Sequence, residues 1–384
     1  MRYRYQVNLA GGVYLGITLL VGVAATIRPN NILVWVFGLL LALIAIGGLV
    51  SGASLYRMSL RRIDPGHGRV GRPMVVRYVV RGGSNRLPLF DLSITERAGD
   101  GPGDWSRFSR PDPAWLMHAA PDEAAHAESV LIPDRRGRMC FDRISATSSF
   151  PFGLLGKSVG VSQPMETLVH PHTVPIAPAA LDRLLGGGGN GDRSSRRPGH
   201  QGEFMGLREY RSGDSVRSIA WKRWRQDDSP VVVQRASPSP RRVIILLDLR
   251  RATNELRVAD GVDPRAMEET AITLAGSIAE TGIEHGIEVG LRVAGAVTSD
   301  LPTQGGRRHL DRLLAGLGAI ELDDPRDRPG VSIPPPRLSS LVVIHVDRVD
   351  PSFGHDEARH LLPESLDGLQ VDPAIGSATR ETPA

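Results

Sequence analysis

Two uncharged runs near the N-terminus place the strongest constraint on the fold of this chain. The first covers residues 9–27 and the second covers residues 32–56, with Arg28-Pro29-Asn30-Asn31 between them. Each run is long enough to cross a hydrocarbon core, for which about 20 residues suffice. A cleaved signal peptide does not explain the first run, because a second apolar run follows it instead of a cleavage site and a polar chain. Residues 1–62 are therefore predicted to form a two-helix transmembrane anchor.

The arginines that flank the two runs predict how the anchor is oriented. Those on the outer sides are Arg2, Arg4, Arg57, Arg61 and Arg62, whereas Arg28 alone lies in the connecting loop. Positively charged flanks tend to stay in the cytoplasm, so both ends of the anchor are expected there. We expect a multi-pass protein of the inner (cytoplasmic) membrane, with its body in the cytoplasm.

Residues 63–175 change to short β-prone runs that turn residues separate. The predicted strands cover residues 74–80, 89–95, 127–132, 138–146 and 166–171. Short strands at this spacing are typical of an antiparallel sandwich-like domain. Residues 99–126 are rich in Gly, Pro and Asp and give no prediction.

Two short motifs in this region are false leads. Gly156-Lys157-Ser158 resembles the end of a phosphate-binding loop, but Pro151 stands where the first glycine should be and no helical pattern follows. His170 and His172 have no cysteine or carboxylate cluster to complete a metal site. The sequence contains no HExxH or CxxC motif. We expect no cofactor, and no small-molecule substrate is identifiable.

Residues 176–200 are predicted to be a flexible linker, because Gly186 to Gly189 and the arginines that follow cannot bury enough apolar surface. Residues 193–242 carry twelve Lys/Arg against five Asp/Glu, with tyrosine and tryptophan between them. Such a stretch can bind nucleic acid or anionic lipid headgroups. The alternative is a network of ion pairs. The rest of the chain offers no nucleic-acid module, which disfavours nucleic acid as the partner.

Residues 201–240 combine arginines and carboxylates around a predicted helix. Asp214 or Ser215 can cap that helix, whose apolar positions are Val216, Ile219, Ala220 and Trp224. Residues 231–236 are predicted to be a strand. Pairing of Arg208, Arg211 and Arg217 with Glu203, Glu209 and Asp214 would lock the loop and its neighbouring domains together. The same cluster also allows a hydrolase-like enzyme acting on a phosphorylated or glycan substrate.

Residues 202–222 resemble the hallmark of the domain-of-unknown-function 58 (DUF58) family. They read GEFMGLREYRSGDSVRSIAWK, and the matching positions include Glu203, Arg208, Glu209, Tyr210, Asp214, Arg217, Trp221 and Lys222. Ser212 stands where proline is usual. The resemblance implies a non-enzymatic interaction or scaffold protein that works beside a MoxR-type AAA+ ATPase in assembly or envelope processes. The signature residues are then interaction residues.

Residues 241–370 alternate strands with helices. Strands are predicted at residues 241–249, 287–295 and 341–347, and helices at residues 267–282 and 307–318. This order predicts a doubly wound α/β sheet with helices on both faces. Residues 371–384 are predicted to be a disordered tail.

This α/β region resembles a von Willebrand factor A-like domain with a degenerate metal site. Such domains often hold a divalent cation through Asp-x-Ser-x-Ser after the first strand and through a later aspartate. Here Asp248 and Asp347 occupy the aspartate positions, but Arg250 and Ala252 replace both serines. A guanidinium beside Asp248 disfavours a cation. We expect no metal, and we expect Arg250 to pair with Asp248 or Asp347. The loops at the strand ends would form the docking surface.

Overall fold

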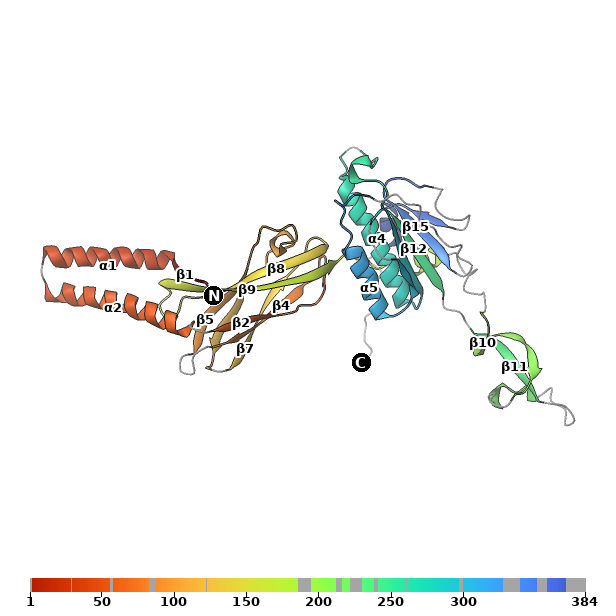
Figure 1. The fold of residues 1–384 in the computed structure, drawn as a ribbon, viewed down its shortest axis with the longest axis horizontal. Helices are drawn as coiled ribbons and strands as arrows, with labels where there is room; N and C mark the ends of the chain where they lie inside the picture. The colour runs from red at the N-terminus through yellow and green to blue at the C-terminus, as the bar shows by residue number, and fades with distance from the viewer. Residues whose placement is uncertain are drawn as a thin grey trace, which may run out of the picture. The chain divides into compact units, whose positions relative to one another are not determined.

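The computed structural model describes residues 2–28, 30–55, 58–82, 88–121, 123–185, 195–211, 216–221, 230–237, 241–259, 261–296, 300–326, 339–350 and 358–370. The chain divides into two compact units, Met1–His170 and Pro171–Ala384 (Figure 1).

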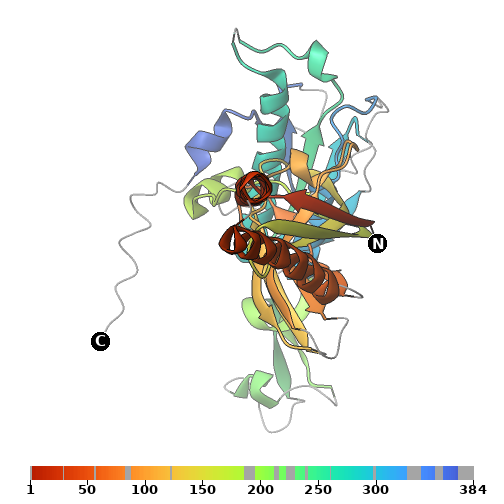
Figure 2. The ribbon, with the colours of Figure 1, turned by 90° about the vertical axis from the view of Figure 1, so that its left-hand side faces the viewer.

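Two long helices form the N-terminal part of the first unit. They are α1 (Leu9–Ile27) and α2 (Asn31–Ser54), which run antiparallel and lie side by side in both views (Figures 1 and 2). The Tyr14 hydroxyl donates a hydrogen bond of 3.1 Å to the carbonyl of Leu40 and so ties them together. Both helices are long and apolar enough to cross a membrane, which suggests membrane association.

A strand that the sequence did not lead us to expect precedes the helices. This strand, β1 (Arg2–Val7), pairs antiparallel with β9 (Leu155–His170) from Arg2↔Gly160 to Val7↔Leu155. At the start of α1, a Cβ on Gly11 would lie 2.0 Å from the carbonyl oxygen of Leu154, so only glycine allows this approach. The strand β2 (Ser59–Ile63) follows α2. The segments at both ends of the helix pair therefore belong to the β region.

The β region contains two sheets that share one hydrophobic core. The larger has the order β1-β9-β8-β5-β6, with β3 beside β9, and the smaller has the order β2-β4-β7. The remaining strands are β3 (Gly68–Arg69), β4 (Met74–Arg81), β5 (Leu89–Arg97), β6 (Ala114–Ala119), β7 (Ala124–Leu131) and β8 (Gly137–Ser148). Along β4, buried residues such as Val76 and Tyr78 alternate with exposed arginines and pack with Leu92 and Ile94 of β5.

The five strands predicted for this region are present, most of them within longer elements. Residues 166–171 are the end of the sixteen-residue strand β9, which also contains Lys157 and Ser158 of the apparent phosphate loop. Residues 99–126, for which nothing was predicted, contain a short 3₁₀ helix (Trp105–Arg107), β6 and the start of β7.

A buried ion pair connects the two sheets. Arg62 on β2 donates to both carboxylate oxygens of Glu96 on β5, at 2.8 and 2.7 Å, and the two side chains are 0% and 1% exposed. The Tyr78 hydroxyl donates to Glu96 at 2.9 Å, and the third guanidinium nitrogen of Arg62, Nη1, donates to the carbonyl of Gln163 at 2.9 Å. The charge of Arg62 is therefore paired inside the β region. Arg62 does not contribute to the positively charged flank that predicts the membrane orientation.

The second unit is built on a five-stranded sheet of order β14-β13-β12-β15-β16. Four strands are parallel: β12 (Arg242–Asp248), β13 (Glu288–Ala294), β15 (Ser340–His345) and β16 (Arg359–Leu361). The edge strand β14 (Leu301–Gln304) is antiparallel to β13. The strands β12 and β15 contain continuous apolar runs, as expected for strands that are buried on both faces.

Four helices of this unit contribute to one large core cluster on one face of the sheet. They are α3 (Pro178–Leu184), α4 (Pro264–Glu284), α5 (Arg307–Gly318) and α6 (Ser365–Leu369). Leu246 and Val343 point into a separate small cluster. The prediction of helices on both faces is thus not met by the helices that the structure describes.

Helix α3 lies inside the predicted linker of residues 176–200, and the strand β10 (Ser195–Glu209) begins within it, so that prediction is wrong at residues 176–185 and 195–200. Leu181, Leu184 and Leu185 follow helical spacing and are buried in the core, and Pro178 is suited to the first helical turn. Residues 186–194 lie outside the described residues. The predicted tail 371–384 also lies outside the described residues.

Candidate functional site

The carboxyl ends of β12 and β15 lie next to each other, with Asp248 opposite His345 in the parallel register. Strand β12 is also where the strand order reverses, because α4 leads from it to β13 on one side while β15 lies on the other. In open α/β sheets, ligands bind outside the carboxyl ends of the strands at such a point. A ligand site is therefore expected at the residues that follow β12 and β15.

Asp248 ends β12 and is held from two sides. Its Oδ1 accepts a hydrogen bond of 2.9 Å from Nε of Arg250, and its Oδ2 lies 3.2 Å from Nδ1 of His345. Burial alone would raise the pKa of Asp248, but the hydrogen bonds from His345 and Arg250 outweigh it and hold the pKa below its usual value. The carboxylate is therefore ionised and already engaged.

The loop after β12 supplies a second arginine to the loop after β15. Arg250 also donates to Asp350 at 2.7 Å, and Arg251 forms an ion pair with Asp347. Asp347 is 2% exposed, and it also accepts a hydrogen bond of 3.3 Å from the backbone N–H of Arg257. Two adjacent arginines thus pair with three aspartates from the neighbouring strand ends.

This arrangement can be compared with the degenerate metal site that the sequence predicts. Arg250 pairs with Asp248, one of the two predicted pairings, whereas Asp347 pairs with Arg251 instead. Ala252 precedes a short 3₁₀ helix, η4 (Thr253–Glu255), and offers no side-chain oxygen. Among the residues that the structure describes, no three His, Cys, Asp or Glu side chains are placed to hold a metal ion. The carboxylates at this site are instead paired with guanidinium groups.

A pocket of about 500 Å³ opens over these ion pairs. Its lining holds four arginines and three carboxylates: Asp248, Arg250, Arg251, Glu255, Arg257, Arg348 and Asp350. Arg257 and Arg348 are exposed at this pocket. Because arginine presents a planar fork of donors that matches carboxylates and phosphates, the pocket is suited to an anionic group.

Two histidines extend the network away from the pocket. Nε2 of His345 lies 2.9 Å from Nδ1 of His360 on β16, and their rings lie 11° from parallel. Burial and the neighbouring His345 lower the pKa of His360. Neither imidazole lines the pocket, so the chain Asp248–His345–His360 runs into the sheet.

The signature segment forms a separate two-stranded sheet of β10 (Ser195–Glu209) and β11 (Val231–Ser237). The predicted helix after Ser215 is wrong at its described residues. Val216–Ser218 form a single 3₁₀ turn, and Ile219 then pairs with Val232. The β-branched run Val231–Val233 offers these residues a strand partner, which overrides the helical spacing.

The predicted ion-pair cluster of this segment falls largely outside the described residues. Asp214 and Lys222 are not described, nor is the side chain of Glu203. Glu209 and Arg217 are exposed, and Arg208 donates to the carbonyl of Glu209 at 3.0 Å. Tyr210 donates its backbone N–H to Pro230 at 2.8 Å, and the side chain of Trp221 is 56% exposed. The cluster itself remains a prediction.

Sequence reasoning missed Arg251, Asp350, His345 and His360. Two features of the sequence could have indicated this site. They are the tandem Arg250-Arg251 after an apolar strand and the spacing of Asp347 and Asp350. Arg251, Asp350 and His345 have partners about a hundred positions away, which they meet only through the parallel pairing of β12 with β15. His360 reaches His345 through the pairing of β15 with β16.

The fold and site together define a class: an α/β domain, attached to a β region with two apolar helices, in which arginine–carboxylate pairs occupy the carboxyl end of the parallel sheet. Residues 206–333 match the model of the family described as Protein of unknown function DUF58. The match supports the resemblance seen in the sequence and covers β12, α4, β13 and α5. No curated protein matched the chain.

Proposed function

We propose that this protein is a membrane-anchored, non-enzymatic interaction or scaffold protein whose α/β domain docks an acidic group of a partner protein. The observation that carries the proposal is the pocket at the ends of β12 and β15, where Arg250 and Arg251 take the place that a cation would need. A metal ion recruits a carboxylate from a partner by its positive charge. Here the pocket presents guanidinium groups in place of a metal, including those of the exposed Arg257 and Arg348.

Exposed arginines at the pocket are available to contact a partner protein. Arg250 is shared between Asp248 and Asp350, and these contacts hold it in place. Arg257 and Arg348 are exposed on the same pocket and can turn toward an incoming carboxylate. An acidic side chain can form a bidentate pair with such an arginine, while the pairs beneath supply a rigid floor.

The finer assignments of fold and location belong to the same proposal. We take the β region to be a sandwich, the α/β domain to be von Willebrand factor A-like, and the helix pair to cross the inner membrane twice with the body in the cytoplasm. Support comes from two sheets that share one core, from the strand order around β12, and from the apolar helices.

The partner that the family resemblance favours is a MoxR-type AAA+ ATPase. The enzyme alternative is less well supported at this pocket, because Arg250 holds both Asp248 and Asp350 and leaves them poorly suited to act as general bases. The hydrolase-like alternative for the cluster at residues 203–222 and the anionic-lipid or nucleic-acid alternative for residues 193–225 remain predictions.

A binding measurement tests this proposal. The full-length protein in detergent is titrated with a purified MoxR-type AAA+ ATPase from the same organism, and the affinity is compared between wild type, Arg348→Glu and Arg308→Glu. Arg348→Glu is expected to weaken binding at least tenfold, since it places a like charge against the acidic group. Arg308 is also exposed but lies on α5, so Arg308→Glu should bind as the wild type does.

Two results would count against this function. If both variants bind equally well, the pocket is not the docking site. If the wild-type protein shows no saturable binding to the ATPase, the proposed partner is wrong.

A further inference from the structure

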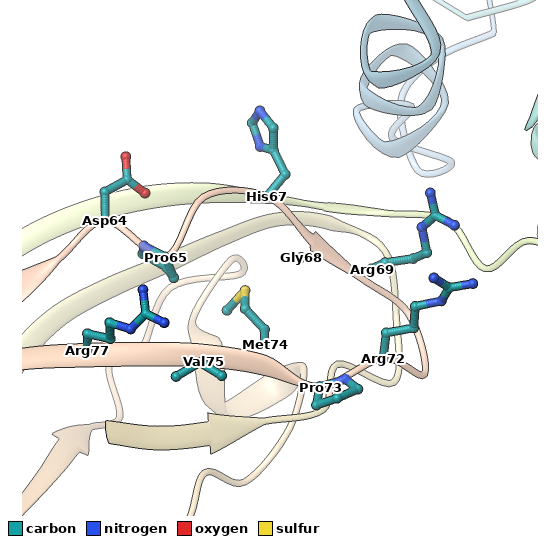
Figure 3. Close-up of a pocket in the computed structure, with 10 residues that line it drawn as sticks. All are labelled: Asp64, Pro65, His67, Gly68, Arg69, Arg72, Pro73, Met74, Val75 and Arg77. Carbon is teal, nitrogen blue, oxygen red and sulfur yellow. The ribbon is translucent and has the colours of Figure 1, made fainter. Parts of the chain in front are cut away.

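A second pocket lies in the first unit, Met1–His170. Here the chain leaves the smaller sheet after β2, forms β3 beside the larger sheet and returns to the smaller sheet as β4. Strands β2 and β4 are antiparallel neighbours, and Ile63 lies opposite Arg77. Residues 64–73 connect them by way of β3, which pairs with β9 of the larger sheet through Gly68↔Val169 and Arg69↔His170. The detour leaves a cavity of about 370 Å³ between β3 and the start of β4 (Figure 3).

The backbone of this detour is fixed at several points. The carbonyl of Gly66 accepts a hydrogen bond from the Thr167 hydroxyl, and the Gly71 N–H donates to Pro133 at 2.8 Å. The Arg72 N–H closes a turn onto the carbonyl of Arg69 at 3.1 Å. A Cβ on Gly68 would lie 2.9 Å from the Met74 sulfur, so β3 packs closely over β4. The groups that line the cavity therefore start from a rigid frame.

Three arginines and one aspartate give the cavity its charge. Arg69 and Arg72 extend from the turn in the same direction, whereas Arg77 rises from β4 toward Pro65 (Figure 3). Arg77 also pairs with Glu128 at 2.9 Å, a contact in which both side chains are more than half exposed. Exposed pairs of this kind contribute little and exchange readily. The Asp64 carboxylate accepts the Gly66 N–H at 2.9 Å.

We propose that this cavity binds a soluble, phosphate-bearing anion larger than inorganic phosphate, of the size of a diphosphate or a small organic phosphate. Arg69 and Arg72 come from the turn and Arg77 comes from β4, so the guanidinium groups lie at different sides of the cavity. They suit a ligand that carries oxygens on more than one side. A single carboxylate does not have such an arrangement of oxygens. The volume falls in the range of small-ligand sites, about 300–1,000 Å³, and exceeds what one phosphate ion needs.

The position of the cavity favours a soluble ligand over a lipid headgroup. Strand β2 leaves α2 at its Ser59 end, and the cavity lies beyond its Ile63 end. Four residue steps along a strand amount to about 13 Å. The cavity is thus at the end of β2 and β4 that points away from the helix pair.

Titration calorimetry of the full-length protein with inorganic pyrophosphate, at constant ionic strength, tests the proposal. The protein is held in nanodiscs of phosphatidylcholine, and wild type is compared with Arg72→Gln, Arg77→Gln and Arg81→Gln. The Arg72 and Arg77 substitutions are each expected to weaken binding at least tenfold. Arg81 is exposed at the other end of β4, so Arg81→Gln is the matched control and should leave the affinity unchanged.

The outcomes separate the possible sources of the anion. Absence of saturable binding by the wild type, or equal weakening by Arg72→Gln and Arg81→Gln, would overturn the site. Adding phosphatidylglycerol to the nanodiscs should not change the affinity for pyrophosphate. A marked loss there would assign the cavity to lipid headgroups and overturn the soluble ligand. Binding of pyrophosphate to the arginines of the docking pocket in the α/β domain would be unaffected by Arg72→Gln and by Arg77→Gln, so a loss of affinity in these two variants reports on this cavity alone.

Discussion

The role of Asp248 depends on its neighbours: the same strand-end carboxylate can bind a metal ion or accept hydrogen bonds from cationic side chains. A strand-end aspartate with hydroxyl neighbours is a metal ligand. With Arg250 two residues later and His345 across the sheet, the same carboxylate becomes the acceptor of a fixed ion pair. Arg250 and Arg251 are therefore the cationic groups that the aspartates of this site bind.

The His345–His360 contact predicts how acid affects this unit. Burial and His345 lower the pKa of His360, while Asp350 opposes the shift. The unfolded chain takes up a proton near pH 6.5, where the folded protein still excludes it, so stability falls as the pH drops through that value. Because the pKa of Asp248 is also lowered, its contribution is present above about pH 4 and is lost only below that value.

Thermal unfolding at pH 7.5 and pH 5.5 checks this expectation. The midpoint of the wild-type protein should fall on acidification, and His360→Gln should show a smaller fall. His172 is exposed in the same unit, so His172→Gln should retain the wild-type response. An unchanged acid response in His360→Gln would exclude His360 as the group responsible.

At the scale of elements, the Arg62–Glu96 pair joins strands of different sheets. Both side chains are fully buried, and Phe141 lies under the guanidinium at 4.7 Å. Removing one partner of a buried pair leaves an uncompensated charge and typically costs about 3–5 kcal/mol. We therefore expect Glu96→Leu to destabilise the β region by about that amount.

The double variant Arg62→Met/Glu96→Leu provides the control. It removes both charges at similar volume and should recover much of the lost stability, as measured by urea unfolding in detergent. A double variant as unstable as Glu96→Leu would mean that packing, and not the unpaired charge, explains the loss.

Elements with a strong local pattern could be predicted from the sequence. The helix at residues 307–318 coincides with α5, and the β-prone run at residues 74–80 gives β4. The strand β1 was missed although Tyr3, Tyr5 and Val7 alternate, because its arginines were interpreted as membrane flanks and its partner lies about 150 residues away. The helix predicted around Ile219 was wrong for a similar reason, since pairing with β11 decides that segment.

The candidate site could be predicted in part. Asp248 and Arg250 are two residues apart, so their pairing could be inferred from the sequence alone. Asp350 and His360 reach the site through the order of the parallel strands, which hydrophobic patterning does not specify. Long-range register is what sequence reasoning lacked here.

At the scale of the molecule, β1 and β2 constrain the topology of the anchor. They lie before α1 and after α2, and both are strands of the β region, so the two ends of the helix pair are on one side of any membrane that it crosses. The proposed function requires that side to be the cytoplasm. The single cysteine of the chain, Cys140, is exposed on β8 and can report the side directly.

A membrane-impermeant maleimide is expected to label Cys140 only after the inner membrane is opened. Burial, together with Glu166 and Asp104, raises the pKa of this thiol, so the reaction is run at pH 8 to obtain enough thiolate. In the variant Asn30→Cys/Cys140→Ser, the reporter lies in the loop between the helices and should react while the membrane is intact. Because the two reporters lie at opposite ends of the helix pair, labelling of Cys140 in intact cells would place the body outside the cytoplasm. A cytoplasmic ATPase could then not be its partner.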